Sequence, residues 1–146
     1  MAASMPLPLK GTVCISVNDF DKGAVARIAR ELHDLGFKII ATKGTSEWLN
    51  KIHIDTELIN KVNEGSPHIV DALREGKIHL IINTPYGGQG HDDGAQIRNM
   101  AYQVNVPLVT TMSAAMATLQ GIKRHRETNL QVKSLQEHHR SKSKAP

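Results

Sequence analysis

The segment 42–46 reads Thr-Lys-Gly-Thr-Ser and follows an apolar run, so small hydroxylated residues, a glycine and a lysine come together in the chain. An amphipathic segment begins directly behind it, and this pattern predicts a strand, a turn and the start of a helix. Hydroxyls, backbone N–H groups and an ammonium at a helix N-terminus favour a phosphate or a carboxylate. The spacing matches neither glycine-rich nucleotide fingerprint, G-x-x-x-x-G-K-[ST] or G-x-G-x-x-G. The residues therefore indicate an anion site, and an ordinary strand-to-helix connection is the alternative.

Polar residues with compatible chemistry also follow the other predicted strands. Ligands of parallel α/β sheets collect at the carboxyl ends of the strands. Lysines, hydroxyls and carboxamides gathered at one such edge are suited to holding a phosphate group. Beyond the segment 42–46, the residues concerned are Asn18, Asp19, Lys22, Lys61, Asn83, Thr84, Thr110 and Thr111.

An alternation of strands and helices must position these residues. Runs of β-branched and apolar residues predict strands at 11–17, 37–42, 54–62, 78–85 and 106–111. Capping residues and helical apolar spacing predict helices at 25–35, 46–53, 66–75, 93–104 and 112–122. We expect Ser66 to cap the helix 66–75, and the glycines between 87 and 94 to make that loop mobile. The pattern predicts an α/β fold, a three-layer sandwich with a five-stranded parallel sheet and right-handed crossovers.

The chain of 146 residues is expected to form one domain with a basic end. Its net charge is +4, but the segment 121–146 has seven basic and two acidic residues, so it carries +5 and the remainder carries −1. We expect a lead-in over 1–10, a domain over 11–122, and a basic polar tail over 123–146 that is helix-prone or disordered. The five aromatic residues are scattered, and nucleic-acid surfaces usually array basic residues with aromatics, so no nucleic-acid partner is expected.

Several other classes of protein are disfavoured by composition. The single cysteine, Cys14, lies in an apolar strand pattern, which predicts a buried thiol, no intrachain disulfide and a reducing compartment. No apolar run approaches the length of about 20 residues that a membrane span needs, and no signal-peptide pattern is present, so a cytoplasmic protein is expected. The eight histidines include no H-x-x-x-H pair, so no metal site is expected.

The motifs together resemble those of a known family. They are T-K-G-T at 42–45, N-K-V at 60–62, E-G at 64–65, P-H-I at 67–69, I-I-N-T at 81–84, and V-P at 106–107 with T-T at 110–111. They resemble the methylglyoxal-synthase-like domain, in the version found at the C-terminal end of the carbamoyl-phosphate synthetase large chain. The resemblance extends over residues 11–122.

The resemblance implies a regulatory domain that binds a nucleoside monophosphate and needs no cofactor of its own. In the bacterial family UMP inhibits, IMP activates, and ornithine acts at a neighbouring interface. The implied parent chain is an ATP-dependent ligase that uses ATP with Mg or Mn and makes carbamoyl phosphate for arginine and pyrimidine biosynthesis. The implied partners are the remaining domains of the large chain, the glutaminase small chain and further copies in a homo-oligomer. The chain alone is expected to have no catalytic residues.

The resemblance also assigns site residues by motif position. Lys22, Thr42, Thr45 and Lys61 match the positions that hold the effector phosphate. Asn83 and Thr84 match positions that approach the ribose and base, and Ile97 and Thr111 match less direct pocket positions. Lys43 is expected to point to solvent. The segment 88–92, Gly-Gln-Gly-His-Asp, replaces a more basic stretch of the bacterial pattern, so the resemblance leaves the base specificity open.

Three alternatives stay open. Methylglyoxal synthase shares the phosphate turn and the matches at Asp19, Lys22 and Thr45, and Asp92 matches one of its acids. However, its principal aspartate, a further acid and its first histidine align with Ser66, Tyr86 and Asn18, and His91-Asp92 is out of register with the enzyme's His-Asp. The cyclohydrolase of purine biosynthesis is a weaker alternative, because its Lys-Thr-Leu-His-Pro loop has no counterpart here. A pure oligomerisation module is compatible with the regulatory reading.

Overall fold

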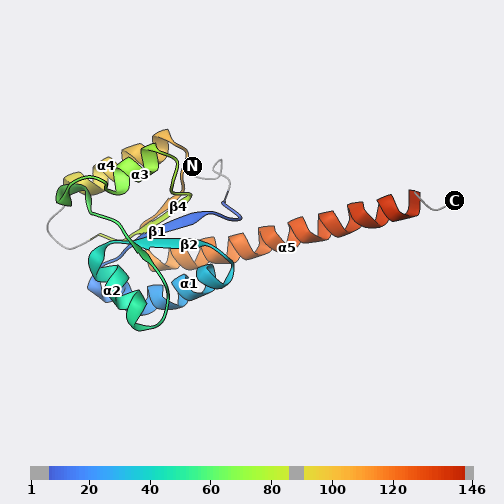
Figure 1. Ribbon diagram of the computed structural model, residues 1–146, viewed down its shortest axis with the longest axis horizontal. Helices are drawn as coiled ribbons and strands as arrows, with labels where there is room; N and C mark the ends of the chain where they lie inside the picture. Colours follow the sequence, from blue (N-terminus) through green and yellow to red (C-terminus); the bar gives the residue numbers. More distant parts are fainter. Residues whose placement is uncertain (1–6, 86–90, 144–146) are drawn as a thin grey trace.

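The computed structural model describes residues 7–85 and 91–143, with side chains described for 7–85 and 94–136. Five parallel strands form one sheet in the order β3-β2-β1-β4-β5. The strands are β1 (Thr12–Ser16), β2 (Lys38–Ala41), β3 (Glu57–Leu58), β4 (Leu80–Asn83) and β5 (Leu108–Val109). The helices are α1 (Lys22–Asp34), α2 (Lys43–Lys51), α3 (Ile69–Arg74), α4 (His91–Gln103) and α5 (Met112–Ser143), with 3-10 turns η2 (Asp19–Asp21) and η3 (Val62–Glu64). The predicted fold class is confirmed (Figure 1).

The strand order reverses beside β1. The chain proceeds outward from β1 through β2 to β3, and then returns to place β4 on the other side of β1. The last residues of β1 and β4, Ser16 and Asn83, are partners in the register. A parallel sheet opens a crevice at such a switch point, outside the carboxyl ends of the strands. The sheet order therefore brings the segments after β1, β2 and β4 to one edge.

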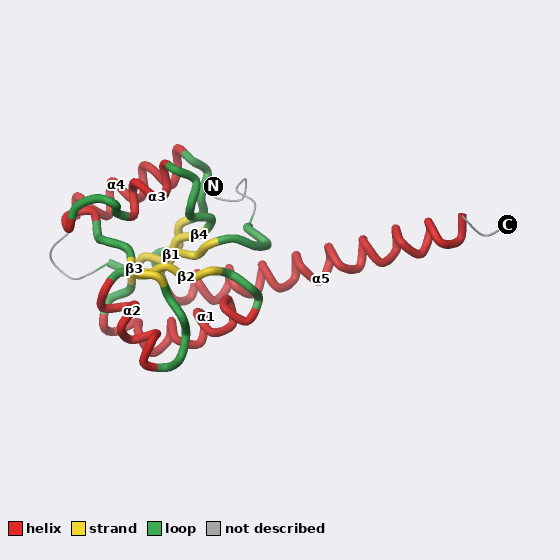
Figure 2. Tube along the Cα trace, viewed as in Figure 1, coloured by secondary structure: helices red, strands yellow, loops and turns green. Residues whose placement is uncertain are grey.

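Helices cover both faces of the sheet (Figure 2). Successive side chains of a strand point to opposite faces, so Val13 and Ile15 face one layer and Cys14 faces the other. The first face packs against α1, α2 and the start of α5, and the second packs against α3 and α4. Cys14 is completely buried, and burial raises the pKa of its thiol to about 12. The predicted buried thiol is thus confirmed.

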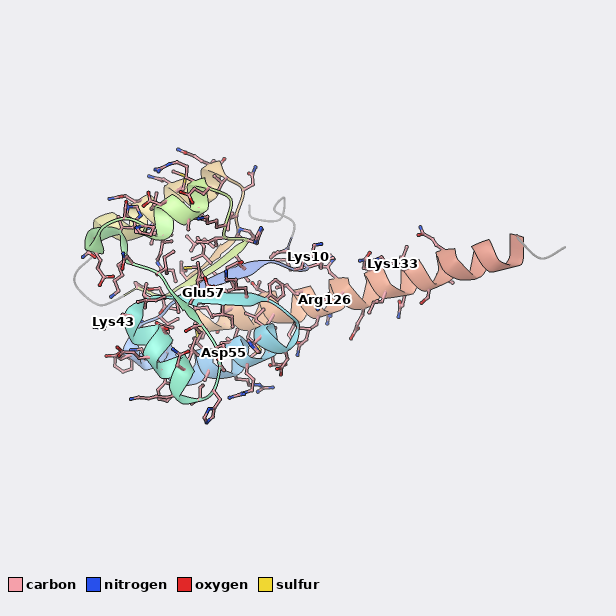
Figure 3. All side chains as sticks on the ribbon, in the orientation of Figure 1. Lys10, Lys43, Asp55, Glu57, Arg126 and Lys133 are labelled. Atoms are coloured by element: carbon pink, nitrogen blue, oxygen red, sulfur yellow. The ribbon has the colours of Figure 1, made fainter. Side chains whose placement is uncertain are left out.

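Helix α5 is longer than the predicted core helix, because it continues without a break to Ser143. Its first part is buried through Ala115, Leu119 and Ile122. Arg126 then donates to the Leu9 carbonyl oxygen over 2.8 and 2.6 Å and lies 5.5 Å from the centre of the Phe37 ring. Figure 3 shows Arg126 where the helix leaves the domain and Lys133 further out. The predicted boundary at 122/123 falls inside this helix, and the division into domains stays a prediction.

Several predicted element ends differ from the structure. Helix α3 begins at Ile69, and its cap is His68 and not Ser66, because residue 68 has an extended backbone that bridges to Asn60. The third strand is reduced to Glu57–Leu58, and α2 begins at Lys43, three residues before its predicted start. Most of the glycine loop that was predicted to be mobile lies outside the described residues. Within the described part of the chain, none of the helices has the length and apolarity needed to cross a membrane.

The ion pair between Lys123 of α5 and Glu31 of α1 predicts how the free energy of unfolding depends on pH. The Glu31 carboxylate accepts a hydrogen bond from Lys123 Nζ, and this bond is the main reason why the pKa of Glu31 is lowered. Stability from a lowered carboxyl pKa is complete above the unfolded-state pKa of about 4.3 and is lost as the pH falls through the folded-state value. We expect Lys123→Met to lower the free energy of unfolding at pH 7 by about 0.5–1 kcal/mol, and to lower it by less at pH 3. Urea denaturation at both pH values measures this, and Arg124→Met removes the same charge from an exposed neighbour as the control. Equal effects of the two substitutions at both pH values would contradict the assignment.

Candidate functional site

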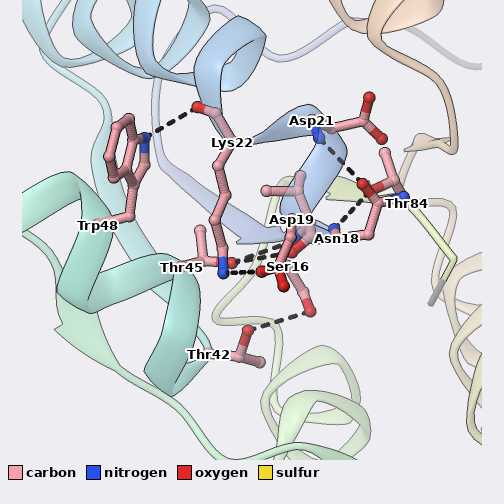
Figure 4. A network of polar contacts seen from close by, with 10 residues as sticks. Ser16, Asn18, Asp19, Asp21, Lys22, Thr42, Thr45, Trp48 and Thr84 are labelled. Carbon is pink, nitrogen blue, oxygen red and sulfur yellow. Dashed lines mark hydrogen bonds and ion pairs between the residues drawn. The ribbon is translucent and has the colours of Figure 1, made fainter.

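The carboxyl edge of the sheet holds a network of buried hydroxyls (Figure 4). Ser16, Thr42, Thr45 and Thr84 are all at most 3% exposed. Thr42 Oγ1 donates to Ser16 Oγ over 3.1 Å, and Thr45 Oγ1 accepts from the Val17 N–H over 3.2 Å. Thr84 Oγ1 accepts from the Asn18 N–H over 2.9 Å. These hydroxyls bind the ends of β1, β2 and β4 to one another, so their first role is structural.

The N-terminus of α2 is left without a side-chain cap. Threonine commonly caps a helix by accepting from the N–H groups of the first turn. Thr42 is the N-cap residue of α2, but its side chain makes no capping hydrogen bond, and its hydroxyl donates to Ser16. The first N–H groups of a helix lack intrahelical partners and carry the positive end of the helix dipole. Because Lys43 and Gly44 are exposed at this point, the first turn of α2 can accept an anion from solvent.

Lys22 places its ammonium over this helix end. Its side chain is 21% exposed, and its Nζ lies 2.5 Å from Asp19 Oδ1. A Cβ added to Gly44 would lie 3.4 Å from the same Nζ, so the lysine reaches the first turn of α2. Trp48, on α2, donates from Nε1 to the Lys22 carbonyl oxygen over 2.9 Å and holds the start of α1 against α2. Two helices thus position one cation at one uncapped helix end.

Lys61 contributes a second positive charge to this edge. The hydrogen bond and the charge of Lys22 are the main causes that lower the pKa of Asp19, and the charge of Lys61 lowers it further. Asp19 itself is 89% exposed at its side chain. Lys61 belongs to the loop after β3, where its N–H donates to Glu64 Oε1 over 2.7 Å. Two lysines, one at the start of α1 and one in the loop after β3, therefore favour a negative charge at this point.

Asn18 connects the first loop to the end of β4. Its Nδ2 donates to the Pro85 carbonyl oxygen over 2.9 Å, and its Oδ1 accepts from the Asp21 N–H over 3.0 Å. The turn η2, between Asn18 and Lys22, is therefore fixed at both ends. Asn83 is half-buried at the last position of β4, directly opposite Ser16.

The structure brings together some of the predicted site residues and separates others. Lys22, Thr42, Thr45 and Thr84 lie in the network or beside it. Ile97 is buried in the core between the sheet and the layer of α3 and α4. Thr111 is exposed, and its Oγ1 accepts from the Ala114 N–H at the start of α5. Among the described contacts, none joins these last two residues to the hydroxyl network.

The sequence did not predict the roles of two residues of this network, Ser16 and Trp48. Ser16 Oγ accepts a hydrogen bond from the Thr42 hydroxyl, and Trp48 fixes the backbone of Lys22 through its indole N–H. A serine at the end of an otherwise apolar strand was a usable signal for a buried polar contact. The indole contact could not be predicted, because it joins residues that are 26 positions apart.

Other surface features lie outside this network. A groove is lined by residues at the starts of β1 and β2, by β3, and by the approach to β4, among them Thr12, Lys38, Leu58 and His79. Of the predicted site residues, none lines it. In the described part of the chain, no group of three histidine, cysteine, aspartate or glutamate side chains could hold a metal ion.

The buried hydroxyl of Thr45 provides a prediction. Thr45→Val keeps the shape of the side chain but removes the oxygen that accepts from the Val17 N–H. We expect the free energy of unfolding to fall by about 1 kcal/mol, the usual net value of a buried hydrogen bond. Thr45→Ser keeps the hydroxyl and is expected to retain more stability than the valine variant. Thermal or urea unfolding compares the two, and a valine variant as stable as wild type would show that this bond contributes nothing.

The architecture defines the chain as a parallel α/β domain with a topological switch point beside β1, and ligands of this class usually bind at such a point. The family model of the MGS-like domain matches residues 24–110, and the chain belongs to this family. The predicted resemblance is thus confirmed.

The relatives include large chains of carbamoyl phosphate synthase. The large chain of Methanothermobacter thermautotrophicus is 46% identical over 139 residues, which cover 95% of this chain and 13% of the relative. The C-terminal section of the large chain of Methanopyrus kandleri is 45% identical over 141 residues, which cover 96% of this chain and 26% of the relative. The arginine-specific chloroplastic large chain of Arabidopsis thaliana is 41% identical over 138 residues, which cover 94% and 12%. The chain therefore corresponds to a minor part of each relative.

A solved structure supports the fold. Methylglyoxal synthase from Elizabethkingia anophelis aligns with a TM-score of 0.63 and 20% identity, over 77% of this chain and 79% of that enzyme. At this identity the likeness concerns the fold alone.

Proposed function

We propose that this chain is an allosteric domain of a carbamoyl phosphate synthase, which binds a phosphorylated nucleotide of the UMP or IMP class and thereby tunes carbamoyl phosphate synthesis. The observation that supports it best is the uncapped N-terminus of α2 beside the Lys22 ammonium. Membership of the MGS-like family and the similarity to large chains supply the context.

The proposed phosphate contacts come from two lysines and the turn. Lys22 and Lys61 offer charge-assisted hydrogen bonds, which contribute about 1.5–3 kcal/mol each. The hydroxyls of Thr42 and Thr45 are engaged with Ser16 and Val17, so these threonines act by shaping the turn that presents backbone N–H groups. Contacts of this strength leave micromolar affinity after association costs of several kcal/mol.

The remaining assigned residues have less direct roles in the proposal. Asn83 ends β4 next to β1 and Thr84 follows it, where a ribose or base attached to the phosphate can reach them. Ile97 supports the pocket from the core of the domain, and Thr111 shapes the loop after β5.

The partners of the proposal follow from the relatives. The other domains of a large chain would hold ATP with Mg or Mn, and a glutaminase small chain would supply ammonia. Ornithine at a neighbouring interface, subunit contacts in a homo-oligomer and a cytoplasmic location belong to the same proposal.

Methylglyoxal synthase activity is the alternative, since that enzyme shares the fold. General acid–base catalysis needs a correctly placed carboxylate near the substrate carbons. The position that matches the principal catalytic aspartate is close to Ser66, whose hydroxyl donates to Asp71 over 2.7 Å. Asn18 stands at the position of the first catalytic histidine, and its amide is engaged with Pro85 and Asp21. Formation of methylglyoxal from dihydroxyacetone phosphate by the pure chain would overturn the regulatory proposal.

Calorimetric titration tests the proposal directly. We expect UMP or IMP to bind with micromolar Kd, and uridine, which lacks the phosphate, to bind far more weakly. Ornithine is titrated in parallel as a ligand without phosphate. A folded chain that binds none of the nucleotides at millimolar concentration would contradict the proposal.

A further inference from the structure

A phenylalanine is presented to solvent beside the proposed phosphate site. Phe20 is 98% exposed, whereas Phe37 is 2% exposed in the core. A phenyl ring in water forgoes the stabilisation that burial of its apolar area would provide. Phe20 is the middle residue of η2, two positions before Lys22 and one after Asp19, which forms the ion pair with that lysine. A large, exposed apolar ring therefore belongs to the same turn that leads into the cationic side chain of Lys22.

The turn that presents this ring is fixed and not a loose end. Asn18 joins it to β4 through its N–H, which donates to Thr84, and through its side chain, which donates to Pro85. Within the turn, the Asp21 N–H donates to Asn18 Oδ1 over 3.0 Å, and Lys22 pairs with Asp19. The segment 18–22 is thus fixed by its own hydrogen bonds and by those to Thr84 and Pro85. It carries both the Lys22 ammonium and the Phe20 ring. A rigid aromatic anchor loses little conformational entropy when a ligand covers it.

The neighbours of the ring favour a small planar ligand over a protein surface. Asp19 and Asp21 flank Phe20, and a protein interface that buried the ring would also have to desolvate these carboxylates, which is costly without paired charges. A nucleobase covers only the ring, and every base has a π-face that can stack on an aromatic side chain. In a nucleotide the base is separated from the phosphate by one sugar, and Phe20 is likewise separated from Lys22 by a single residue of the same turn.

We infer that Phe20 stacks on the base of the nucleotide whose phosphate binds at Lys22 and the N-terminus of α2. This inference rests on the proposed function. It assigns the base-recognition energy to the first loop of the domain, in addition to the end of β4. It also makes the base a contributor to affinity that is separate from the phosphate contacts, because stacking on the ring involves the base and not the phosphate.

Two ligands and three variants test the inference. UMP contains a base, and ribose 5-phosphate has the same phosphate and sugar without it. We expect Phe20→Ala to weaken UMP binding about 5- to 100-fold, the range measured for loss of one base–aromatic stack. Binding of ribose 5-phosphate is expected to stay within about twofold of wild type, because phosphate contacts come from other residues. Phe20→Trp is expected to retain UMP binding, and Tyr102→Ala, which removes an exposed aromatic from α4, is the matched control.

The outcomes separate this inference from the proposed function. If wild type binds UMP and Phe20→Ala binds it equally well, the stacking inference is overturned and the proposed function stands. Equal weakening of UMP and ribose 5-phosphate also overturns it, since the ring would then act through the shape of the turn. If wild type binds neither ligand, the proposed function fails and the inference fails with it. Circular dichroism confirms that each variant is folded.

Discussion

Lys22→Ala is expected to raise the Kd for UMP or IMP about 10- to 100-fold, because it removes a charge-assisted contact of about 1.5–3 kcal/mol. The Nζ of Lys22 lies over the uncapped first turn of α2 and pairs with Asp19 at 2.5 Å. Trp48, on α2, donates to the Lys22 carbonyl oxygen and so fixes the backbone of Lys22 against α2. Calorimetry on the variant and the wild type measures the change.

The control for Lys22→Ala is the substitution of Lys51, which lies at the opposite end of α2 from the candidate site. Lys51→Ala removes an exposed ammonium from the last turn of α2. We expect its Kd to stay close to that of wild type, because charges in solvent are screened within a Debye length of about 10 Å. Equal losses from both substitutions would indicate a general charge effect and would count against a defined phosphate contact.

Gly44→Asp is expected to abolish nucleotide binding, with a loss of at least about 100-fold, because it places a fixed negative charge where the phosphate would bind. Gly44 is the second residue of α2, and a Cβ added there meets only Lys22 Nζ, at 3.4 Å. The new carboxylate can pair with Lys22, and it interacts favourably with the helix dipole. The variant is therefore expected to unfold at the same temperature as wild type or higher, while it loses its ligand.

Gly44→Asn is the matched control for that variant. Asparagine has the size of aspartate without its charge, so it separates steric exclusion from repulsion. We expect the asparagine variant to bind more tightly than the aspartate variant. Wild-type affinity in Gly44→Asp would show that no anion binds at the N-terminus of α2.

Much of the fold could be predicted, because it depends on local patterns. The segment 78–85 is nearly continuous in β-branched and apolar residues, as expected for a strand with both faces covered, and β4 lies there between β1 and β5. The start of α2 was predicted three residues too late, because serine is a common N-cap residue and Ser46 was therefore read as the helix start. In the structure, Ser46 is already inside the helix, and its N–H donates to the Thr42 carbonyl oxygen over 2.7 Å.

The candidate site was predicted in outline, but its contacts were not. Alternation of strands and helices was sufficient to expect Lys22, Thr42 and Thr45 at one edge of the sheet. The direction of the threonine hydroxyls depends on partners in another strand, because Thr42 donates to Ser16 and Thr45 accepts from Val17. Such contacts over 26 and 28 positions leave no mark in a local pattern. The proposed function therefore gives both threonines the role of supporting the turn.

The central claim is that the phosphate of a nucleotide binds to the N–H groups at the start of α2. An amide ¹H–¹⁵N correlation spectrum of the labelled chain, recorded during titration with UMP and IMP, observes these groups individually. We predict that the largest shifts occur at Lys43, Gly44 and Thr45, with smaller shifts through η2, and that inorganic phosphate moves the same three amides. Saturation of the chain with nucleotide while these three amides remain unmoved, with the shifts instead in the groove of Thr12, Lys38, Leu58 and His79, would contradict the claim.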